Sequence, residues 1–489
     1  MLPFRGAATV AIPKKEANIS GTFASLSGLE FSPLEPRYAQ VKAQLMAGHE
    51  DALAESWTRL LTTLRDEIPL IAERGSDIIP TIDFKDIDNA SPEFCSEHRK
   101  RGVAVIRNVI PEQQALDYKR DVKEYISANP QTKAFPPDDP QVYELYWSPS
   151  QVRARAHPNL IKTQRFLLQF WHSRDPNALI SSSHPTTYAD RLRIRQPGDA
   201  RFSLGPHVDN GSCERWEADG YGRGGVYTPI FSGNWELYDP FESSSRIPAQ
   251  PSLYDGVGQC SMLRMYQGWL SLSTVNPFEG TLLVNPLLAK STSYFLLRPF
   301  FTPKQSPESL PQDEFLHPKN WTLEPKPSSW LHGATPGCGQ ELREVLHPHL
   351  NLRIPTPESR SGTSMVHIPL VRPGDYVAWH CDQIHAVDSL HAGKADSSVL
   401  YIPACPLTVE NAAFLKRQRS TFLDGTPGPD YGGGEGERGH LGRLTLEEVR
   451  RDASRDGLRA MGLERWDEQE GLTTAEREVL RRANEVLGF

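Results

Sequence analysis

Strand-like segments are concentrated in one part of this chain of 489 residues, and helix-like segments lie on both sides of it. Residues 36–66 and 112–129, and later LTLEEVRRDASRDGLRAMG and TTAEREVLRRANEVL, place apolar side chains at helical spacing. Between about residues 190 and 405, runs such as SMLRMYQGWLSLSTV, SYFLLRPFF and DYVAWHC are rich in β-branched and aromatic residues and predict strands. Helices, then many strands, then helices indicate an α+β chain around an antiparallel core.

This order of segments divides the chain into three parts. We expect an N-terminal helical extension over residues 1–75, a core over 76–420 and a C-terminal helical tail over 421–489. Residues 303–362 are Pro-rich and irregular, which is typical of a long insertion rather than of a core segment. With 41 Pro and 36 Gly, the chain is expected to carry long ordered loops.

Composition and charge argue against several classes of function. The formal net charge is −8 and the pI about 6.0, whereas phosphate binding favours a basic face. The sequence has no apolar run of the roughly 18–20 residues that span a bilayer. Six cysteines without a CxxC pair predict reduced thiols. We therefore expect a cytoplasmic protein that binds a small molecule and neither nucleic acid nor a membrane.

A candidate metal site begins with His207-Val208-Asp209, at the end of a strand-like run. Residues two apart in a strand point to the same face, so both outer side chains can reach one ion. The segment RPGDYVAWHCDQIHAVD supplies a third candidate, His385, after a Pro-Gly turn, a strand and a short loop. Two histidines and one carboxylate are typical of mononuclear non-heme iron(II) oxygenases, because O2 and an organic co-ligand need the remaining positions. The alternative for the isolated triplet is a solvated turn with a hydrogen-bonded histidine.

Four motifs follow one another in an order that resembles a known superfamily. They are GVAVIRNV, HVD, QGWLSLSTVNPFEGTLLVNP and PGDYVAWHCDQIH, and they span about residues 100–405. This order is similar to that of the phytanoyl-CoA-hydroxylase-like and clavaminate-synthase-like iron(II)/2-oxoglutarate-dependent dioxygenases. ELYWSPSQ, LGPHVDNGSCERWE, RMYQGWLSLS, LLRPFF and PGDYVAWHCDQIHAVDS further resemble a bacterial and fungal family of YbiU-like proteins, over nearly the whole chain.

The resemblance carries expectations about fold, cofactors and ligands. It implies a double-stranded β-helix, the jelly-roll or cupin-like fold, with N-terminal and C-terminal helical decorations. It implies Fe(II) and 2-oxoglutarate as cofactors, with His207, Asp209 and His385 as the metal-binding and catalytic residues. The family pattern favours His385 over the nearby His380, which is then expected in the core or beside a ligand. Trp269 matches the family's tryptophan next to the co-substrate, with plain core packing as the alternative.

One departure from the superfamily pattern concerns the cation that pairs with the far carboxylate of 2-oxoglutarate. The pattern places an arginine about ten residues after the second metal histidine, because a buried carboxylate needs a cationic partner. This chain has Asp396, Ser397 and Ser398 there, and Lys394 falls in an apparent turn. Ser398 remains a candidate for contact with the co-substrate, and the cation is expected from another strand.

Two arginines in otherwise apolar strand-like runs are the candidates for this cation. They are Arg264, just before QGW, and Arg298, in LLRPFF. An arginine in such a run is usually paired, so a structural salt bridge is the alternative for each. Arg264 is preferred because it lies near Trp269, although strict strand alternation would place these two side chains on opposite faces unless a bulge intervenes.

The candidates for substrate contact lie in two other segments. Tyr143, Tyr146 and Trp147 are aromatic residues in a loop-rich region, and either a substrate pocket or a satellite hydrophobic cluster accounts for them. Arg215 follows the HVD triplet and is expected either to bind an anion at the mouth of the site or to form a local ion pair.

We therefore expect an iron(II)- and 2-oxoglutarate-dependent oxygenase that uses O2 to oxidise an unactivated C–H bond of a small polar molecule, such as an amino or organic acid. The outcome would be hydroxylation, desaturation or ring closure. One alternative is a cupin-like metal-dependent hydrolase or isomerase. Another is a non-catalytic jelly-roll binding protein, against which the intact His207, Asp209 and His385 argue.

Overall fold

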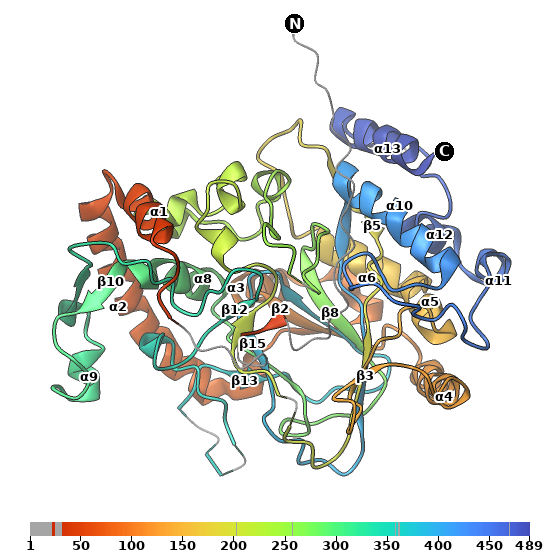
Figure 1. The fold of residues 1–489 in the computed structure, drawn as a ribbon, viewed down its shortest axis with the longest axis horizontal. Helices are drawn as coiled ribbons and strands as arrows, with labels where there is room; N and C mark the ends of the chain where they lie inside the picture. The colour runs from red at the N-terminus through yellow and green to blue at the C-terminus, as the bar shows by residue number, and fades with distance from the viewer. Residues whose placement is uncertain are drawn as a thin grey trace, which may run out of the picture.

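Figure 1 shows the protein as a computed structural model that describes residues 22–24, 32–201, 203–256, 258–356, 358–359, 362–468 and 470–489. Helices and sheets are both extensive, so the fold is α+β, as predicted. The helices are α1 Arg37–Met46, α2 Glu50–Arg74, α3 Pro92–Arg101, α4 Glu112–Ala128, α5 Pro149–Arg155, α6 Pro158–Leu168, α7 Thr228–Phe231, α8 Leu288–Leu297, α9 Gln312–Phe315, α10 Val409–Asp424, α11 Leu446–Asp452, α12 Arg455–Ala460 and α13 Thr474–Leu487.

The larger sheet has eight strands in the order β1-β2-β14-β8-β16-β6-β4-β3. Within it β1 and β2 are parallel, and every other neighbouring pair is antiparallel. The strands are β1 Thr81–Asp83, β2 Val103–Arg107, β3 Ala134–Phe135, β4 Val142–Tyr143, β6 Leu192–Arg195, β8 Tyr266–Ser271, β14 Tyr376–His380 and β16 Ser397–Tyr401.

A second sheet has five strands in the order β12-β7-β15-β9-β13. Two further pairs, β5 with β17 and β10 with β11, stand apart from both sheets. The strands of the second sheet and of these pairs are β7 His207–Val208, β9 Leu282–Val284, β12 Gln340–Glu341, β13 Val366–His367, β15 His385–Val387, β5 Ile180–Thr186, β17 Cys405–Thr408, β10 Phe301–Pro303 and β11 Trp321–Leu323. The edge strand β12 belongs to the Pro-rich segment 303–362, which therefore borders the strand that carries the HVD triplet.

Alternate residues of the larger sheet pack into two different cores, as expected when successive side chains point to opposite faces. Trp269 and Val377 share a core with Val284 of the second sheet. Leu270 and Ala378 join a core that includes side chains of α4 and α6 on the opposite face. The larger sheet is therefore covered by the second sheet on one face and by helices on the other.

Most of the other helices lie on two sides of the molecule. In Figure 1, α1 and α2 with α8 and α9 are on one side, and α10 to α13 are on the other. The helix α10 runs across residue 420, where the sequence analysis placed the boundary between core and tail. In the described part of the chain, no helix combines the length and apolar character needed to cross a membrane.

The prediction of a strand over SYFLLRPFF is wrong. Most of this segment belongs to α8, whose residues from Ser291 to Leu297 are all buried, and a single 3-10 turn follows. A helix that is buried on every side shows no amphipathic spacing, so a short apolar run cannot be distinguished from a buried strand by periodicity.

Candidate metal centre

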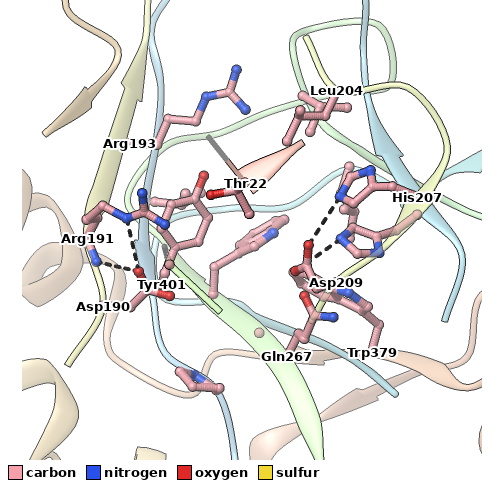
Figure 2. Close-up of a pocket in the computed structure, with 18 of the residues that line it drawn as sticks. Thr22, Asp190, Arg191, Arg193, Leu204, His207, Asp209, Gln267, Trp379 and Tyr401 are labelled. Carbon is pink, nitrogen blue, oxygen red and sulfur yellow. Dashed lines mark hydrogen bonds and ion pairs between the residues drawn. The ribbon is translucent and has the colours of Figure 1, made fainter. Parts of the chain in front are cut away.

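The three predicted metal ligands lie together at two neighbouring strands of the five-stranded sheet, and Figure 2 labels two of them, His207 and Asp209. His207 of β7 and His385 of β15 are directly opposite cross-strand partners, with ring centroids 4.1 Å apart. Asp209 follows β7, with Oδ1 3.5 Å from His207 Nε2 and Oδ2 3.7 Å from His385 Nε2. Asn210 has a left-handed φ of 71°, so the chain turns sharply after the aspartate.

Hydrogen bonds determine which nitrogen of each histidine faces the carboxylate. His207 Nδ1 lies 2.6 Å from the carbonyl oxygen of Gly205, and His385 Nδ1 lies 3.0 Å from that of Gln383. A carbonyl oxygen only accepts, so each Nδ1 carries the hydrogen and donates it. In a neutral imidazole the Nε2 then presents a lone pair toward Asp209.

The protonation of His385 makes this arrangement suited to a cation. Burial, followed by the neighbouring His207, lowers the pKa of His385 to about 3, so this ring is neutral. Its Nε2 lone pair faces the Asp209 carboxylate with no hydrogen between them, so the two groups repel each other. A metal ion bound between them would remove this repulsion. Metal-binding histidines typically donate the other ring N–H to a backbone carbonyl, as both rings do here. Two imidazole nitrogens and one carboxylate are the donor set of non-heme iron(II), so these residues fit the implied metal.

A second buried group, formed by His380, Cys381 and Asp382, also brings possible ligand atoms together. The Asp382 carboxylate forms ion pairs with two arginine side chains, at 2.8 and 2.6 Å. His380 Nδ1 accepts the backbone N–H of Asp382 at 3.0 Å, and its Nε2 donates to the carbonyl oxygen of Pro240 at 2.9 Å. Because these groups already bind one another and the protein, we assign this group to a structural network and not to a metal.

This network connects Asp209, which follows β7, with the loop that leads to His385 on β15. Arg215 donates from Nη1 to Asp382 Oδ1 at 2.8 Å and from Nη2 to the backbone carbonyl of Asp209 at 3.1 Å. Asp382 lies three residues before His385, and Arg246 donates to its other oxygen at 2.6 Å. Burial opposes ionisation of Asp382, but Arg246 and Arg215 hold the pKa of its carboxyl well below the usual range. The Arg215 guanidinium therefore joins the backbone of one metal ligand to the loop that leads into another.

Replacing Arg215 by lysine is expected to weaken iron(II) binding about tenfold, because an ammonium group cannot reproduce the two-pronged contact and partners that orient ligands have effects of this size. Arg246→Lys is the matched control, since Arg246 binds the same Asp382 carboxylate but does not contact Asp209. Anaerobic iron(II) titration gives the affinity, and the absorption spectrum of the cobalt(II)-substituted protein reports the ligand geometry. Equal losses in the two variants would contradict the role of Arg215 as the connecting residue.

The metal ligands open into a cavity between the two sheets. Its lining includes Arg264 and Trp269, two of the residues that the sequence analysis placed beside the co-substrate. Arg264 precedes the first residue of β8, Tyr266, so strand alternation does not decide its direction. Further side chains that line the cavity are Phe23, Arg191, Arg193, Leu204, Asn210, Gln259, Gln267, Ser271, Leu282, Trp379, Val387, Ser397, Val399 and Tyr401.

Two arginines in this lining were missed by the sequence analysis. Arg193 belongs to β6, where it is paired in register with Val399 of β16, and Arg191 immediately precedes β6. Arg191 is bound to Asp190, with 3.4 Å between Nε and Oδ1, and its guanidinium lies over the ring of Tyr431. The signal that could have indicated them is RLRIR, in which arginines alternate with apolar residues as on one face of a strand.

The other two predicted co-substrate residues lie elsewhere. Arg298 follows α8, donates to the carbonyl oxygen of Phe301 at 2.8 Å and lies over the Trp321 ring, so it is not the strand-borne cation that was expected. Ser398 donates to Asp396 Oδ1 at 2.7 Å, on the face of β16 opposite to the cavity. Its neighbour Ser397 lines the cavity instead, because adjacent strand residues point to opposite faces.

The four predicted substrate-contact residues are also absent from the described part of the lining. Arg215 is buried in the ion-pair network, and Tyr143 belongs to β4 near the edge of the larger sheet. Tyr146 and Trp147 are part of a separate hydrophobic cluster, which was the alternative for these aromatic residues. Their backbone N–H groups donate to the Glu437 carboxylate at 2.7 and 2.8 Å, so they position the glycine-rich segment of the tail.

The tail holds part of the cavity wall. Gly258 and Gln259 line the cavity, and the Gly258 N–H donates to the carbonyl oxygen of Asp430 at 3.2 Å. The Asp430 carboxylate accepts the backbone N–H and the hydroxyl of Ser261 at 2.8 and 2.7 Å. The Phe23 ring packs edge-on against His207 with centroids 4.7 Å apart. Neither contact was expected from the sequence, because both join segments that are distant along the chain.

The α+β fold and the buried His-Asp-His group define a protein with a candidate metal centre between two sheets. The chain belongs to the Gig2-like family, whose model matches residues 32–463. It is 29% identical to the Escherichia coli K12 protein YbiU over 412 residues, which are 81% of this chain and 88% of that protein. These matches confirm the predicted resemblance to YbiU-like proteins.

Solved structures agree with this assignment. The crystal structure of GlcNAc Inducible Gene 2 from Candida albicans is similar with a TM-score of 0.81 and 32% identity, over 94% of this chain and 97% of that chain. The crystal structure of the hypothetical protein JW0805 from Escherichia coli is similar with a TM-score of 0.72 and 28% identity, over 87% of this chain and 96% of that chain.

Proposed function

We propose that this chain is a non-heme iron(II)- and 2-oxoglutarate-dependent oxygenase that oxidises an unactivated C–H bond of a small polar molecule. The observation that carries the proposal is the convergence of His207, Asp209 and His385 at the wall of a cavity, with both Nε2 atoms directed at the carboxylate. This donor set leaves coordination positions for O2 and for an organic co-ligand.

The order of the strands supports a double-stranded β-helix as the core. Strands β6, β16, β8 and β14 are adjacent in the larger sheet, and β7, β15, β9 and β13 are adjacent in the second. Along the chain, β6 to β9 alternate between the two sheets, and β13 to β16 alternate again. Strands that alternate in this way wind around one axis and face each other across a shared interior, as in a jelly roll.

Arg193 is the best-placed cation for the far carboxylate of 2-oxoglutarate. In the superfamily pattern this cation comes from the strand after the second metal histidine, which is β16 here. The residue at the expected position, Asp396, instead forms ion pairs with Lys119 and Lys123. Arg193 is paired across the sheet with Val399 of β16, and both line the cavity. The neighbouring strand therefore supplies the cation that β16 lacks.

The residues of the chain would hold and shield the reacting groups. When bound, iron(II) and 2-oxoglutarate together reduce O2, with CO2 lost, one oxygen atom retained in succinate and the other available to oxidise the substrate. His207, Asp209 and His385 would hold the metal, and Arg193 would orient the co-substrate. Trp269 and Trp379 line the same cavity and would keep water away from it.

The protein is expected to form succinate and CO2 from 2-oxoglutarate only when ferrous iron and O2 are both present. Turnover without the natural substrate is expected to be slow, because oxidation of the substrate is then missing. Succinate is measured after anaerobic loading of the metal, with zinc-loaded protein as the control. Full zinc occupancy after anaerobic purification, together with no loss of 2-oxoglutarate in any condition, would favour a metal-dependent hydrolase or isomerase instead.

A further inference from the structure

Arg264 is a buried arginine with few acceptors around it. Its side chain is 9% exposed, and it lines the cavity directly beside the metal ligands. Among the described residues, the single acceptor in hydrogen-bond range is Asn210 Oδ1, 3.1 Å from Nη2. The nearest carboxylate oxygen, Asp209 Oδ2, is 3.9 Å away. A guanidinium carries five N–H donors, so most of those on Arg264 have no protein acceptor in the described structure.

Arg195, which is also buried, differs in this respect. Arg195 lies on β6 and donates to Asp199 Oδ2 at 2.7 Å, to the carbonyl oxygen of Asp388 at 2.8 Å and to that of Asp199 at 3.1 Å. Such pairing is the ordinary way in which a protein compensates a buried charge. Arg264 lacks it, which indicates that its acceptors come from a molecule in the cavity.

Two amide side chains in the same lining also have N–H donors without an acceptor among the described residues. The Nε2 atoms of Gln259 and Gln267 are buried and, among the residues that the structure describes, have no hydrogen-bond acceptor, and the same holds for Arg264 Nε. The Gln259 Oε1 accepts the hydroxyl of Ser252 at 2.9 Å, which directs its Nε2 away from that contact. Donors without acceptors are therefore present at three positions of the cavity lining, and this combination suits an anion.

The charge of the cavity indicates how much negative charge it can accept. Its described lining carries three arginines, Arg191, Arg193 and Arg264, and two aspartates, Asp190 and Asp209. A divalent metal ion adds two positive charges, and dianionic 2-oxoglutarate removes two. One positive charge then remains. Of the three arginines in the lining, Arg264 lies 3.9 Å from the Asp209 carboxylate, whereas Arg191 is paired with Asp190.

We propose that Arg264 and Gln267 form a binding subsite for the carboxylate of a monoanionic substrate. This inference rests on the proposed function, because it assigns Arg193 to the co-substrate and leaves Arg264 for the molecule that is oxidised. A carboxylate matches the planar fork of a guanidinium with two parallel hydrogen bonds. A phosphate group would bring more negative charge than the one remaining positive charge compensates. The substrate class is therefore a small organic acid with a single carboxylate, whose reacting carbon lies near that carboxylate.

The test uses acetate as a carboxylate probe and acetamide as its neutral match. The full-length protein is loaded with manganese(II) and N-oxalylglycine, an unreactive analogue of 2-oxoglutarate, and is titrated calorimetrically at constant ionic strength. We expect saturable binding of acetate and none of acetamide. Arg264→Gln is expected to weaken acetate binding about tenfold, as loss of a charge-assisted pair does, without changing the affinity for manganese or N-oxalylglycine.

Two further variants complete the test. Gln267→Leu removes one neutral donor and is expected to weaken acetate binding several-fold, which keeps the test informative if Arg264→Gln does not fold. Arg298→Gln changes a buried arginine outside the cavity and is expected to leave acetate binding unchanged. The subsite would be overturned if the unmodified protein did not bind acetate. It would also be overturned if Arg264→Gln and Gln267→Leu both bound acetate as tightly as the unmodified protein does.

The same titration without metal separates this inference from the proposed function. The Arg264 subsite needs no metal, so acetate binding by the metal-free protein is also expected to depend on Arg264. Failure to bind manganese or N-oxalylglycine would instead count against the oxygenase assignment. Acetate binding by the metal-free protein would still test the Arg264 subsite in that case.

Discussion

Alanine in place of His207, Asp209 or His385 is expected to abolish iron(II) binding. Each residue would supply one of the three proposed protein ligands, and their possible ligand atoms lie within 4.8 Å of one another. Losing a ligand should cost more than the roughly 10–100-fold that follows from losing a partner that only orients one. Loss of either histidine also leaves the Asp209 carboxylate with one imidazole fewer beside it. Iron per folded protein after anaerobic dialysis measures the effect.

His380→Ala is the matched control for this prediction. His380 lies in the same segment as His385 and is equally buried, but its ring stacks on Trp171 with centroids 4.7 Å apart and both of its nitrogens are hydrogen bonded. This variant is expected to lose thermal stability through the lost packing and to retain its iron. Retention of iron by His385→Ala together with loss by His380→Ala would show that the third ligand has been assigned wrongly.

Replacing Arg193 by glutamine is expected to raise the apparent KM for 2-oxoglutarate by about tenfold or more while iron binding is retained. The lost interaction is a charge-assisted pair in a buried cavity, worth about 1.5–3 kcal/mol, and about 1.4 kcal/mol corresponds to a factor of ten. Arg193 is 6% exposed and lines the cavity that also holds His207, Asp209 and His385. The measurement is succinate formation as a function of 2-oxoglutarate concentration.

Arg298→Gln serves as the control, because Arg298 is also a buried arginine but lies outside the described lining. It is expected to leave the KM unchanged. If instead Arg264→Gln raises the KM and Arg193→Gln does not, the roles proposed for these two arginines are exchanged. If neither variant changes it, another co-substrate replaces 2-oxoglutarate.

The parts of the site that could be predicted are those that depend on residues close together in the sequence. The spacing of His207 and Asp209 fixes two side chains on one face, and His385 follows a turn, a strand and a short loop that end beside them. The strands β2, β8, β14 and β16 and the helices α4 and α13 were also predictable, because their apolar residues recur with a clear period or form β-branched runs.

The parts that could not be predicted depend on pairing between distant segments. Arg193 reaches the cavity because β6 pairs with β16, and no local pattern specifies that partner. The buried helix α8 resembles a strand in sequence, which also misplaced Arg298. Arg215 lies near the triplet in sequence, yet its partner Asp382 comes from the other half of the chain.

The contact between Asp430 and residues 258–261 has a consequence for the order in which the protein matures. During translation, the three proposed metal ligands and Arg264 are made before Asp430 and Glu437. The nascent chain therefore contains its proposed ligands while one wall of the cavity still lacks the contacts of Asp430. A chain interrupted just after α10 would hold these residues beside an unsupported wall, so the cavity closes only after the segment around Asp430 has been made.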